Sequence, residues 1–297
     1  MRLGATTWRK LGRLIKRFGK SPKLKTEGIP YTPLKRPDGT TALDDGVAGE
    51  ITQTRKAPGL DGVSNKAIKC FSQPLLSLLV AIFNACLQNC YFPSVWKEAE
   101  VIGIHKPGKP RDLPASYRPI SLLSGLAKLF ERVLKTRLSN HLFGKGLIID
   151  EQFGFRPAHS CPQQVLRLVE YVMEGFKTKQ KTVAVFFDVA KAFDRVWHAG
   201  LVYKLYSLEV PDRLIFIIQN FLSNRYFTFR HERTHSTRRL IRAGVPQGSA
   251  LSLLYSAYTN DIPRPTSGVQ LALSLMIPRS FFRVGLGAPS SATFEGH

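Results

Sequence analysis

The 297-residue sequence is poor in acidic residues: 21 Asp and Glu stand against 43 Lys and Arg, so the formal net charge is +22. It contains no apolar run approaching the roughly 18 to 20 residues that a membrane helix needs, so we expect no integral membrane protein. The four cysteines include no C-x-x-C pair and do not resemble the framework of a small secreted domain. Structural zinc is therefore not expected, and we predict reduced thiols in an intracellular protein, in the nucleus or the cytoplasm.

The composition is otherwise that of a folded globular protein, with 43% hydrophobic and 10% aromatic residues. The length allows one large or two ordinary domains, and we find no internal repeat. A folded protein with such an excess of positive charge is expected to bind nucleic acid.

The N-terminal segment lacks acids altogether: none precedes Glu27, while the first 25 residues carry nine Lys and Arg. Apolar residues recur there at helical spacing and predict a short amphipathic helix with a basic opposite face: Trp8, Leu11, Leu14, Ile15 and Phe18. A signal peptide is not expected, because no apolar centre follows the charges. A nucleic-acid arm, a targeting segment and a solvated terminus remain open, and we assign residues 1–46 to a basic leader and linker.

The remaining patterns predict an α+β fold, in which helices are interleaved with a few separated strands. Hydrophobic periodicity predicts helices over 75–87, 126–138, 192–208, 213–222 and 249–258, strands over 101–104, 182–188 and 226–229, and a presented loop over 106–116. The strand over 182–188 is apolar on both faces, which predicts a buried strand that ends in Asp188. Taken alone, an acid there is more often a helix cap or an ion-pair partner than a metal ligand.

Seven separate segments together resemble the reverse transcriptase domain of non-LTR retrotransposons of the Jockey type. They occur in the family's order: Lys56–Gly62, Phe92–Lys97, His105–Pro110, Ser116–Leu123, Gln152–Pro157, Phe187–His198 and Gly244–Ser249. The resemblance implies the fingers and part of the palm of a right-hand polymerase, with fingers and the start of the palm over 47–180 and palm over 181–273. It also implies template-directed nucleotidyl transfer with two Mg²⁺ ions, an RNA template, a DNA primer and deoxynucleoside triphosphates.

The same resemblance assigns the catalytic metal site. Asp188 is implied to be the first metal-binding carboxylate, with the backbone carbonyl of Val189 beside it, since Mg²⁺ prefers oxygen ligands. Asp194 belongs to the motif but lies six residues further on, where we expect a helix-start or ion-pairing residue.

Nucleotide contacts are implied for the fingers and for the start of the palm. Lys106 and Arg118 resemble the pair that grips the triphosphate, with Lys109 as a competitor for Lys106 and an exposed loop charge as the alternative. Phe193 occupies the position of the side chain that lies against the sugar C2′, although simple core packing would also explain it.

Template contacts are implied for two further segments. Gln247 and Gly248 resemble the turn that faces the template–nucleotide pair, and an ordinary helix cap is the alternative. Phe155 and Arg156 resemble the segment that contacts the template strand by stacking and phosphate pairing.

The second half of the metal site is missing from the sequence. The family has an aromatic, Ala, Asp, Asp run on a hairpin after a strand such as Leu271–Leu273, but here the chain continues Ser-Leu-Met-Ile. After Asp261 the only acid is Glu295. We therefore expect a palm without its catalytic hairpin, no thumb, and impaired Mg²⁺ binding.

A shifted reading frame explains this departure. Leu273 through Phe282 can be written CTT TCG CTG ATG ATA CCG CGC TCT TTT TTC, and reading from the third base gives Phe-Ala-Asp-Asp-Thr-Ala-Leu-Phe-Phe. Residues 274–297 are accordingly interpreted as an out-of-frame, disordered tail, and the chain as an inactive polymerase fragment. The alternative is a non-catalytic basic nucleic-acid-binding protein. A third hypothesis is a chain that is not stably made, because the Asp188 strand would lose a neighbour.

Overall fold

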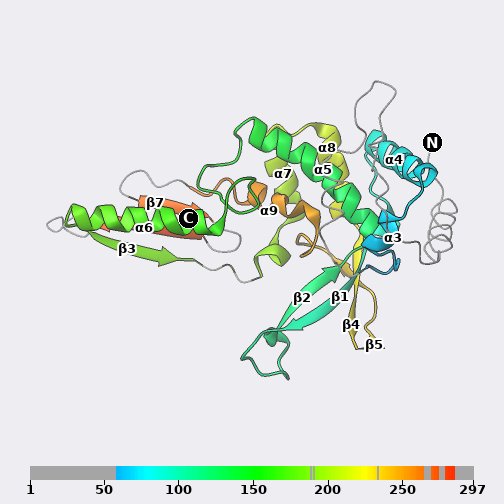
Figure 1. Cartoon of the computed structure of the whole chain (residues 1–297), viewed down its shortest axis with the longest axis horizontal. Helices are drawn as coiled ribbons and strands as arrows, with labels where there is room; N and C mark the ends of the chain where they lie inside the picture. Colours follow the sequence, from blue (N-terminus) through cyan, green and yellow to red (C-terminus); the bar gives the residue numbers. More distant parts are fainter. Residues whose placement is uncertain are drawn as a thin grey trace.

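The structure is a computed structural model that describes residues 58–187, 189, 191–232, 234–263, 269–273 and 278–284. The predicted leader helix and Asp188 therefore lie outside the described residues. Figure 1 shows three parts: a central helical body, a sheet that projects from it, and a lobe in which a helix lies across a second sheet.

The helical body follows the predicted hydrophobic periodicity. It contains α3 (Asn65–Lys69), α4 (Gln73–Gln88), α5 (Gly125–Gly144), α7 (His198–Ser207), α8 (Asp212–Leu222) and α9 (Leu253–Tyr258), with short 3₁₀ turns η1 (Ser94–Trp96), η3 (Ala192–Arg195) and η4 (Ala250–Ser252). The helices predicted over 75–87, 126–138 and 213–222 are confirmed as α4, α5 and α8. The helix predicted from residue 192 begins only at His198, because Lys191 has a left-handed backbone and residues 192–195 form the 3₁₀ turn η3.

An aromatic cluster forms the centre of this body. The ring of Phe130, on α5, lies 5.0 Å from that of Phe83 on α4, 5.6 Å from that of Phe92 and 5.8 Å from that of Trp96. Phe92 in turn makes an edge contact with Phe221 on α8 at 5.0 Å. Phe92 and Trp96 belong to one of the motif segments, so this motif anchors the fold by packing.

The projecting sheet has the strand order β2-β1-β4-β5, with β6 paired to β4. Its strands are β1 (Glu98–His105), β2 (Tyr117–Leu122), β4 (Arg225–His231), β5 (Thr234–His235) and β6 (Arg239–Ile241). β1 pairs antiparallel with β2 and parallel with β4. The strands predicted over 101–104 and 226–229 are confirmed within β1 and β4, and the predicted loop, with the 3₁₀ turn η2 (Pro114–Ser116), joins β1 to β2.

The lobe consists of α6 (Cys161–Lys177) and a three-stranded sheet of order β3-β8-β7. β3 is Lys181–Phe186, β7 is Val269–Leu273 and β8 is Pro278–Val284. α6 begins with a capping box in which Ser160 and Gln163 satisfy each other's backbone groups. Gly175 allows α6 to approach the sheet, since a Cβ there would lie 2.7 Å from Oγ1 of Thr182.

The prediction that the 182–188 strand is buried on both faces is wrong. Val183 and Phe187 are exposed. β3 lies at the edge of its sheet, and α6 packs against the face that includes Thr182. Apolar residues on both faces of a strand therefore show that both faces can be buried. They do not show that another element covers each face.

The expected absence of a hairpin after Leu273 is also corrected. β7 and β8 pair antiparallel, with Leu273 opposite Pro278, and β8 pairs with β3, with Phe186 opposite Arg279. Residues 278–284 belong to the tail predicted to be disordered, yet they form a strand that gives β3 its neighbour. Phe281, Phe282 and Val284 favour extended backbone, which explains the strand without the family's acidic residues.

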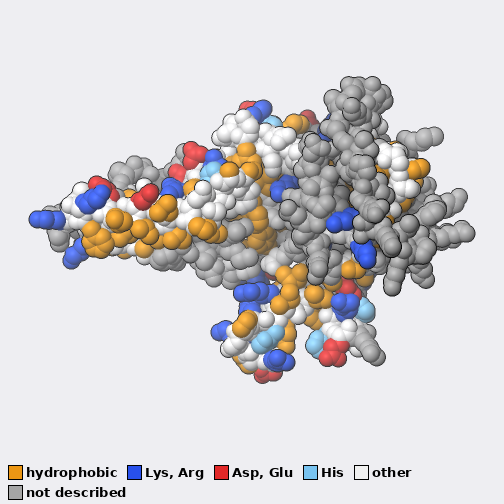
Figure 2. All heavy atoms as spheres, in the orientation of Figure 1, with side chains coloured by type: hydrophobic (Ala, Val, Ile, Leu, Met, Phe, Trp, Pro, Cys, Tyr) orange, Lys and Arg blue, Asp and Glu red, His pale blue; other side chains and the backbone are white. Residues whose placement is uncertain are grey.

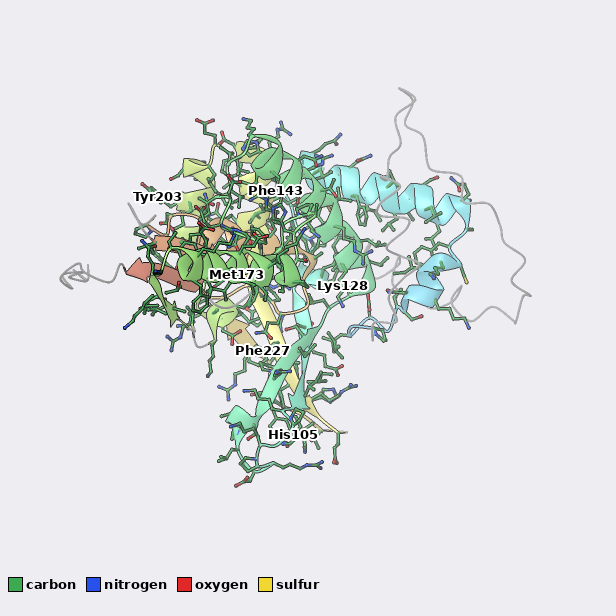
Figure 3. All side chains as sticks on the ribbon, turned by 60° about the vertical axis from the view of Figure 1, so that its left-hand side comes forward. His105, Lys128, Phe143, Met173, Tyr203 and Phe227 are labelled. Atoms are coloured by element: carbon green, nitrogen blue, oxygen red, sulfur yellow. The ribbon has the colours of Figure 1, made fainter. Side chains whose placement is uncertain are left out.

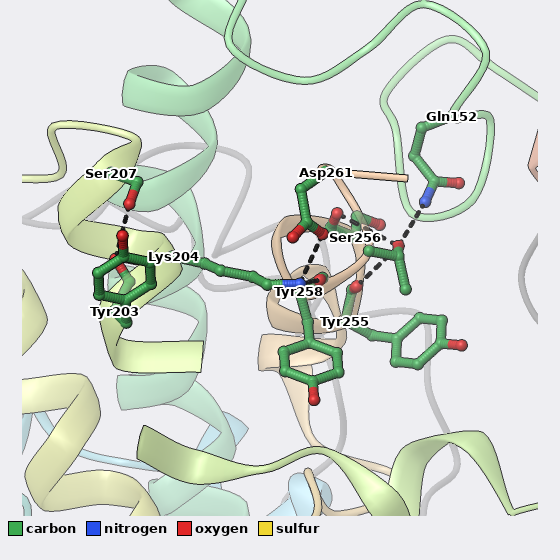
Figure 4. A network of polar contacts seen from close by, with 9 residues as sticks. Gln152, Tyr203, Lys204, Ser207, Tyr255, Ser256, Tyr258 and Asp261 are labelled. Carbon is green, nitrogen blue, oxygen red and sulfur yellow. Dashed lines mark hydrogen bonds and ion pairs between the residues drawn. The ribbon is translucent and has the colours of Figure 1, made fainter. Parts of the chain in front are cut away.

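Polar contacts join the end of α9 to α7 and to the loop after α5, as Figure 4 shows. Nε2 of Gln152 donates to Oγ1 of Thr259 at 3.3 Å, and Nζ of Lys204, on α7, lies 2.5 Å from Oδ1 of Asp261. The Lys204 ammonium also donates to the carbonyl of Tyr258 at 2.6 Å. These contacts position the chain between α9 and β7. In the described part of the chain, no helix has the length and apolar content to cross a bilayer.

Truncating Phe130 to Ala should destabilise the protein by about 3–5 kcal/mol, because the aromatic cluster would lose its fully buried central ring and keep a cavity. Urea denaturation followed by circular dichroism measures the loss. Tyr203→Ala is the matched control, because the Tyr203 side chain is 72% exposed on α7. Equal midpoints for the two variants would contradict this description of the core.

Candidate functional site

β3 and β7 end, and β8 begins, at the same end of the lobe sheet. β3 ends at Phe186, which pairs with Arg279 near the start of β8, and β7 ends at Leu273 opposite Pro278. Four residues, 274–277, connect β7 to β8. The strands that they connect end beside the C-terminal end of β3. Val189, whose carbonyl is the predicted second metal ligand, is exposed. Asp188 and residues 274–277 themselves lie outside the described residues, so the metal site stays a prediction.

Phe193 lies in the core. It is buried, stacks on Tyr255 with ring centroids 4.9 Å apart, and makes an edge contact with Phe155 at 5.8 Å. The alternative of core packing thus describes the contacts of its side chain, and its contact with a sugar stays a prediction. The Phe193–Phe155 contact joins the predicted nucleotide and template segments.

The Gly244–Ser249 turn is tied to the Phe187–His198 segment by its backbone. Gly244 N donates to Val196 O at 2.8 Å and Val245 N to Phe193 O at 2.9 Å. His198 Nε2 donates to the carbonyl of Gly244 at 2.8 Å. Gly244 has φ +93°, and a Cβ there would lie 2.9 Å from the Phe193 carbonyl, so the close approach requires glycine.

The same turn also contacts the base of the projecting sheet. The Gln247 carbonyl accepts from Ser121 N at 3.2 Å, while the Gln247 side chain is only partly buried. Gly248 is exposed, has φ +104°, and leaves room for Ser121 O, which would lie 2.9 Å from a Cβ. Gln247 and Gly248 therefore lie where the helical body and the projecting sheet meet, and their contact with a template–nucleotide pair stays a prediction.

Glu131, on α5, fixes the end of this turn by hydrogen bonds, a role that the motifs did not predict. It is fully buried on α5, and its Oε2 accepts from Ser249 Oγ at 2.9 Å and from Ala250 N at 2.8 Å. Burial raises the pKa of Glu131, and the charge of Arg225 opposes that rise. The sequence carried a signal for it: Glu131 follows Ala127 by four residues and precedes Leu134 by three, on the apolar face of the predicted helix.

Arg225 is buried near this carboxylate, and Lys97 is buried near Arg225. Arg225, the first residue of β4, donates from Nη1 to Phe221 O at 3.2 Å, and burial lowers its pKa to about 10. Burial, and then the charge of Arg225, lower the pKa of Lys97 to about 8. The body thus contains three ionisable groups at the point where α5, the turn and the projecting sheet meet.

The loop between β1 and β2, residues 106–116, is held by three side-chain hydrogen bonds. Lys106 Nζ donates to Ala115 O, His105 Nε2 to Lys109 O and Tyr117 OH to Arg111 O, each at 2.9 Å. The predicted phosphate ligand Lys106 is therefore engaged in the loop itself. Lys109, Arg111 and Arg118 are exposed, and within the described ranges their side chains make no hydrogen bond or ion pair. Whether Lys106 or Lys109 contacts a triphosphate stays a prediction.

The predicted template residues lie in the loop between α5 and α6. Phe155 has φ +58°, an uncommon backbone for a bulky residue, and packs on Phe193. Arg156 donates to Asp150 at 3.0 Å and to the carbonyl of Ile149 at 3.3 Å. Asp150 is almost fully exposed, so this ion pair is weak and its guanidinium could be shared with a phosphate.

The first motif segment contacts the residues that join β2 to α5. Asp61 Oδ2 accepts from Ser124 Oγ at 2.5 Å, and Gly59 packs directly on the backbone of Leu123, where a Cβ would lie 2.6 Å from the carbonyl carbon. Pro58–Gly62 is thereby attached to the end of the Ser116–Leu123 segment. The described residues contain no group of three or more His, Cys, Asp or Glu side chains suited to a metal ion.

Residues 104–275, more than half of the chain, match the family described as "Reverse transcriptase (RNA-dependent DNA polymerase)", and the chain belongs to this family. This result agrees with the contacts of the motif segments around the Gly244–Ser249 turn. It also agrees with the mixed helix-and-sheet fold.

The relatives lie among insect retrotransposons. The chain is 44% identical over 214 residues to the "Probable RNA-directed DNA polymerase from transposon BS" of Drosophila melanogaster, covering 72% of this chain and 24% of the relative. It is 42% identical over 214 residues to the "RNA-directed DNA polymerase from mobile element jockey" of the same species, covering 71% of this chain and 23% of the relative. The resemblance to the Jockey type is thereby confirmed. The chain spans about a quarter of the length of these relatives.

Among solved structures, the fold is similar to "Structure of apo telomerase from Candida Tropicalis", with a TM-score of 0.47 and 10% sequence identity. That match covers 71% of this chain and 44% of the telomerase chain.

The buried lysine makes stability depend on pH. The pKa of Lys97 falls from 10.5 to about 8 on folding, so between these values the unfolded state binds more protons and stability rises with pH. Lys97→Met should be more stable than the wild type at pH 7, and its advantage should shrink from pH 8 towards pH 10. Urea denaturation across this range measures the difference, with exposed Lys109→Met as control. An advantage that is independent of pH would contradict the assignment.

Proposed function

We propose that the chain is a fragment of a retrotransposon-encoded RNA-directed DNA polymerase that retains the fingers and most of the palm and that does not polymerise. The family match and the seven ordered motif segments support the origin. The single observation that carries the loss of activity is the identity of the residues between β7 and β8.

Those residues do not fit a magnesium site. Mg²⁺ takes oxygen ligands in a strict octahedral arrangement and keeps several waters, so a two-ion site needs several carboxylates. Ser-Leu-Met-Ile supplies one hydroxyl and three apolar side chains, and no acid follows in β8. The site would then keep Asp188 and the Val189 carbonyl but lack the two carboxylates of the acidic pair. Most of the stabilisation of a phosphoryl transition state would then be missing.

A slipped reading frame accounts for both the lost acids and the retained hairpin. In the neighbouring frame proposed above, the four residues become Phe-Ala-Asp-Asp, while positions 281 and 282 encode Phe in either frame. The extended, apolar character of β8 is therefore preserved, since a run of T encodes Phe in every frame. The acidic pair is lost, while the apolar character of β8 is kept.

The remaining substrate contacts are part of the same proposal. Lys109, in the loop between β1 and β2, and Arg118, on β2, are exposed cations available to a triphosphate, and Lys106 holds that loop. Gln247 and Gly248 would face the template–nucleotide pair, and Phe155 and Arg156 the template strand.

The purified chain should show no Mg²⁺-dependent incorporation in a primer-extension assay with an RNA template. Incorporation that Asp188→Ala abolishes would contradict the proposed inactivity. Because a chain of this length could also be inactive for lack of other parts, a second measurement isolates the metal site.

That measurement restores the acids. The combined variant Ser274→Phe, Leu275→Ala, Met276→Asp and Ile277→Asp should bind Mn²⁺, a spectroscopic substitute for Mg²⁺, in an electron paramagnetic resonance titration. The wild type should not. Adding Asp188→Ala to the restored variant should weaken that binding, because the metal would lose one of its carboxylates. Equal Mn²⁺ binding by the wild type and the restored variant would show that the missing acids are not the cause.

The exposed cations favour nucleic-acid binding as a second candidate function. Lys109 and Arg111 are exposed in the loop between β1 and β2, and Arg118 is exposed on β2, in a chain with net charge +22. Binding that relies on phosphates alone would be sensitive to salt and blind to sequence.

Fluorescence anisotropy distinguishes the two functions. A polymerase fragment should bind a primer–template more tightly than either single strand at equal salt, whereas a general binder should not. In both cases Arg118→Ala should lower the slope of log affinity against log salt by about 1. An unchanged slope would remove Arg118 from the interface. Lys177→Ala, on the lobe, is the control.

A further inference from the structure

A pocket lies between three helices of the body, α4, α5 and α8. Its volume of about 510 Å³ is within the range of small-molecule sites. Residues four apart lie one turn from each other on the same face of a helix, and each helix contributes such a pair. These pairs are Asn84 and Gln88 on α4, Arg137 and His141 on α5, and Arg213 and Ile217 on α8.

The pocket has an apolar floor. Leu214 and Ile217, on α8, are buried in the core of the body, and Leu87, on α4, packs against that core. Apolar walls with a few polar groups are typical of sites that bind small organic ligands. The floor therefore favours a ligand with an apolar part, such as a flat ring.

The charged side chains of the pocket are basic. Arg137 and Arg213 are exposed, and no acidic side chain occurs among the described residues that line the pocket. Nη1 of Arg213 donates to the carbonyl of Gln88 at 3.4 Å, which leaves most of the five N–H groups of this guanidinium. Nε2 of His141 donates to the carbonyl of Leu208 at 3.0 Å, which orients the ring. Charge thus selects an anion, and a planar guanidinium suits the oxygens of a phosphate.

Two amide groups lie beside these cations. Asn84 and Gln88 are exposed, and within the described part of the chain their side chains make no hydrogen bond. A side-chain amide both donates and accepts, so it can pair with the edge of a nucleobase. The pocket therefore combines partners for a phosphate, for a ring face and for a ring edge.

We propose that this pocket binds one nucleotide unit. Arg213 and Arg137 would contact the phosphate, the base would lie on the floor formed by Leu214 and Ile217, and the amide of Asn84 would pair with the edge of the base. A free nucleoside monophosphate and one nucleotide of a single strand share this chemistry, and the test below distinguishes them.

The pocket is separate from the predicted triphosphate contacts. In Figure 3 the labelled Phe143 marks the end of α5 that carries His141, whereas His105 lies at the far tip of the projecting sheet. Figure 1 shows the same separation between α5 or α8 and the tips of β1 and β2. The Lys and Arg side chains that gather on the projecting sheet in Figure 2 therefore belong to another surface.

Titration with adenosine monophosphate, followed by NMR of the chain with ¹³C-labelled histidine, tests the proposal. The sequence has seven histidines, and the His141 signal is the one that is lost in His141→Asn. This signal should shift and saturate in the wild type, while that of His105 should not move. Arg213→Gln should weaken binding about tenfold, because the phosphate would lose a charge-assisted hydrogen bond, and Arg213→Lys should restore only part of it. Lys145→Gln is the matched control: it removes the same charge from an exposed residue just after α5.

Two further ligands divide the nucleotide into its halves. Inorganic phosphate and adenosine should each bind at least about tenfold more weakly than the monophosphate. A short single-stranded RNA that binds more tightly than the monophosphate, with the same loss in Arg213→Gln, would identify a strand as the source. Equal affinity of the two would identify a free nucleotide.

Three results would overturn the proposal. They are a His141 signal that does not respond to the monophosphate, inorganic phosphate that binds as tightly as the monophosphate, and equal losses of affinity in Arg213→Gln and Lys145→Gln. None of these measurements depends on polymerisation or on the predicted metal site, so the proposed function and the nucleotide pocket can fail separately.

Discussion

The hydrogen bonds of the Gly244–Ser249 turn are the constraint on which the rest of the structure depends. Its backbone bonds to Phe193 and Val196 on one side and to Ser121 on the other, and Glu131 accepts from its end. Segments that are distant in sequence are thus fixed to one short turn. The buried carboxylate behind it is costly, and its interactions with Ser249, Ala250 and Arg225 offset that cost. The turn that we propose to face the template–nucleotide pair therefore also holds the helical body to the projecting sheet.

The strand pairing of the lobe does not depend on acidic residues. β7 and β8 form because their side chains favour extended backbone and because β3 offers an edge, and neither condition requires an acid at the tip. Catalysis depends on the identity of two residues, whereas the strand pairing depends on the general character of a dozen. A frame shift at Leu273 would consequently remove the metal site while leaving the hairpin in place.

Long periodic segments were predictable from the sequence, and so were the motif positions. α4, α5 and α8 follow from apolar spacing, and the family follows from ordered motifs. The exposure of Val183 and Phe187 did not follow, because an apolar alternation says which residues can be buried, not whether anything covers them. The role of Lys106 was also out of reach, since its bond to Ala115 depends on how the loop closes. Glu131 could have been found, as a charge on an apolar helical face.

The central claim, that this chain lost its second pair of metal-binding acids by a slip of the reading frame, is tested most directly by the gene itself. The codons from Leu273 to Phe282 should read Phe-Ala-Asp-Asp-Thr-Ala-Leu-Phe-Phe when taken from the third base, and the shifted frame should remain open beyond them. Codons that cannot encode Asp-Asp in that frame would contradict the account.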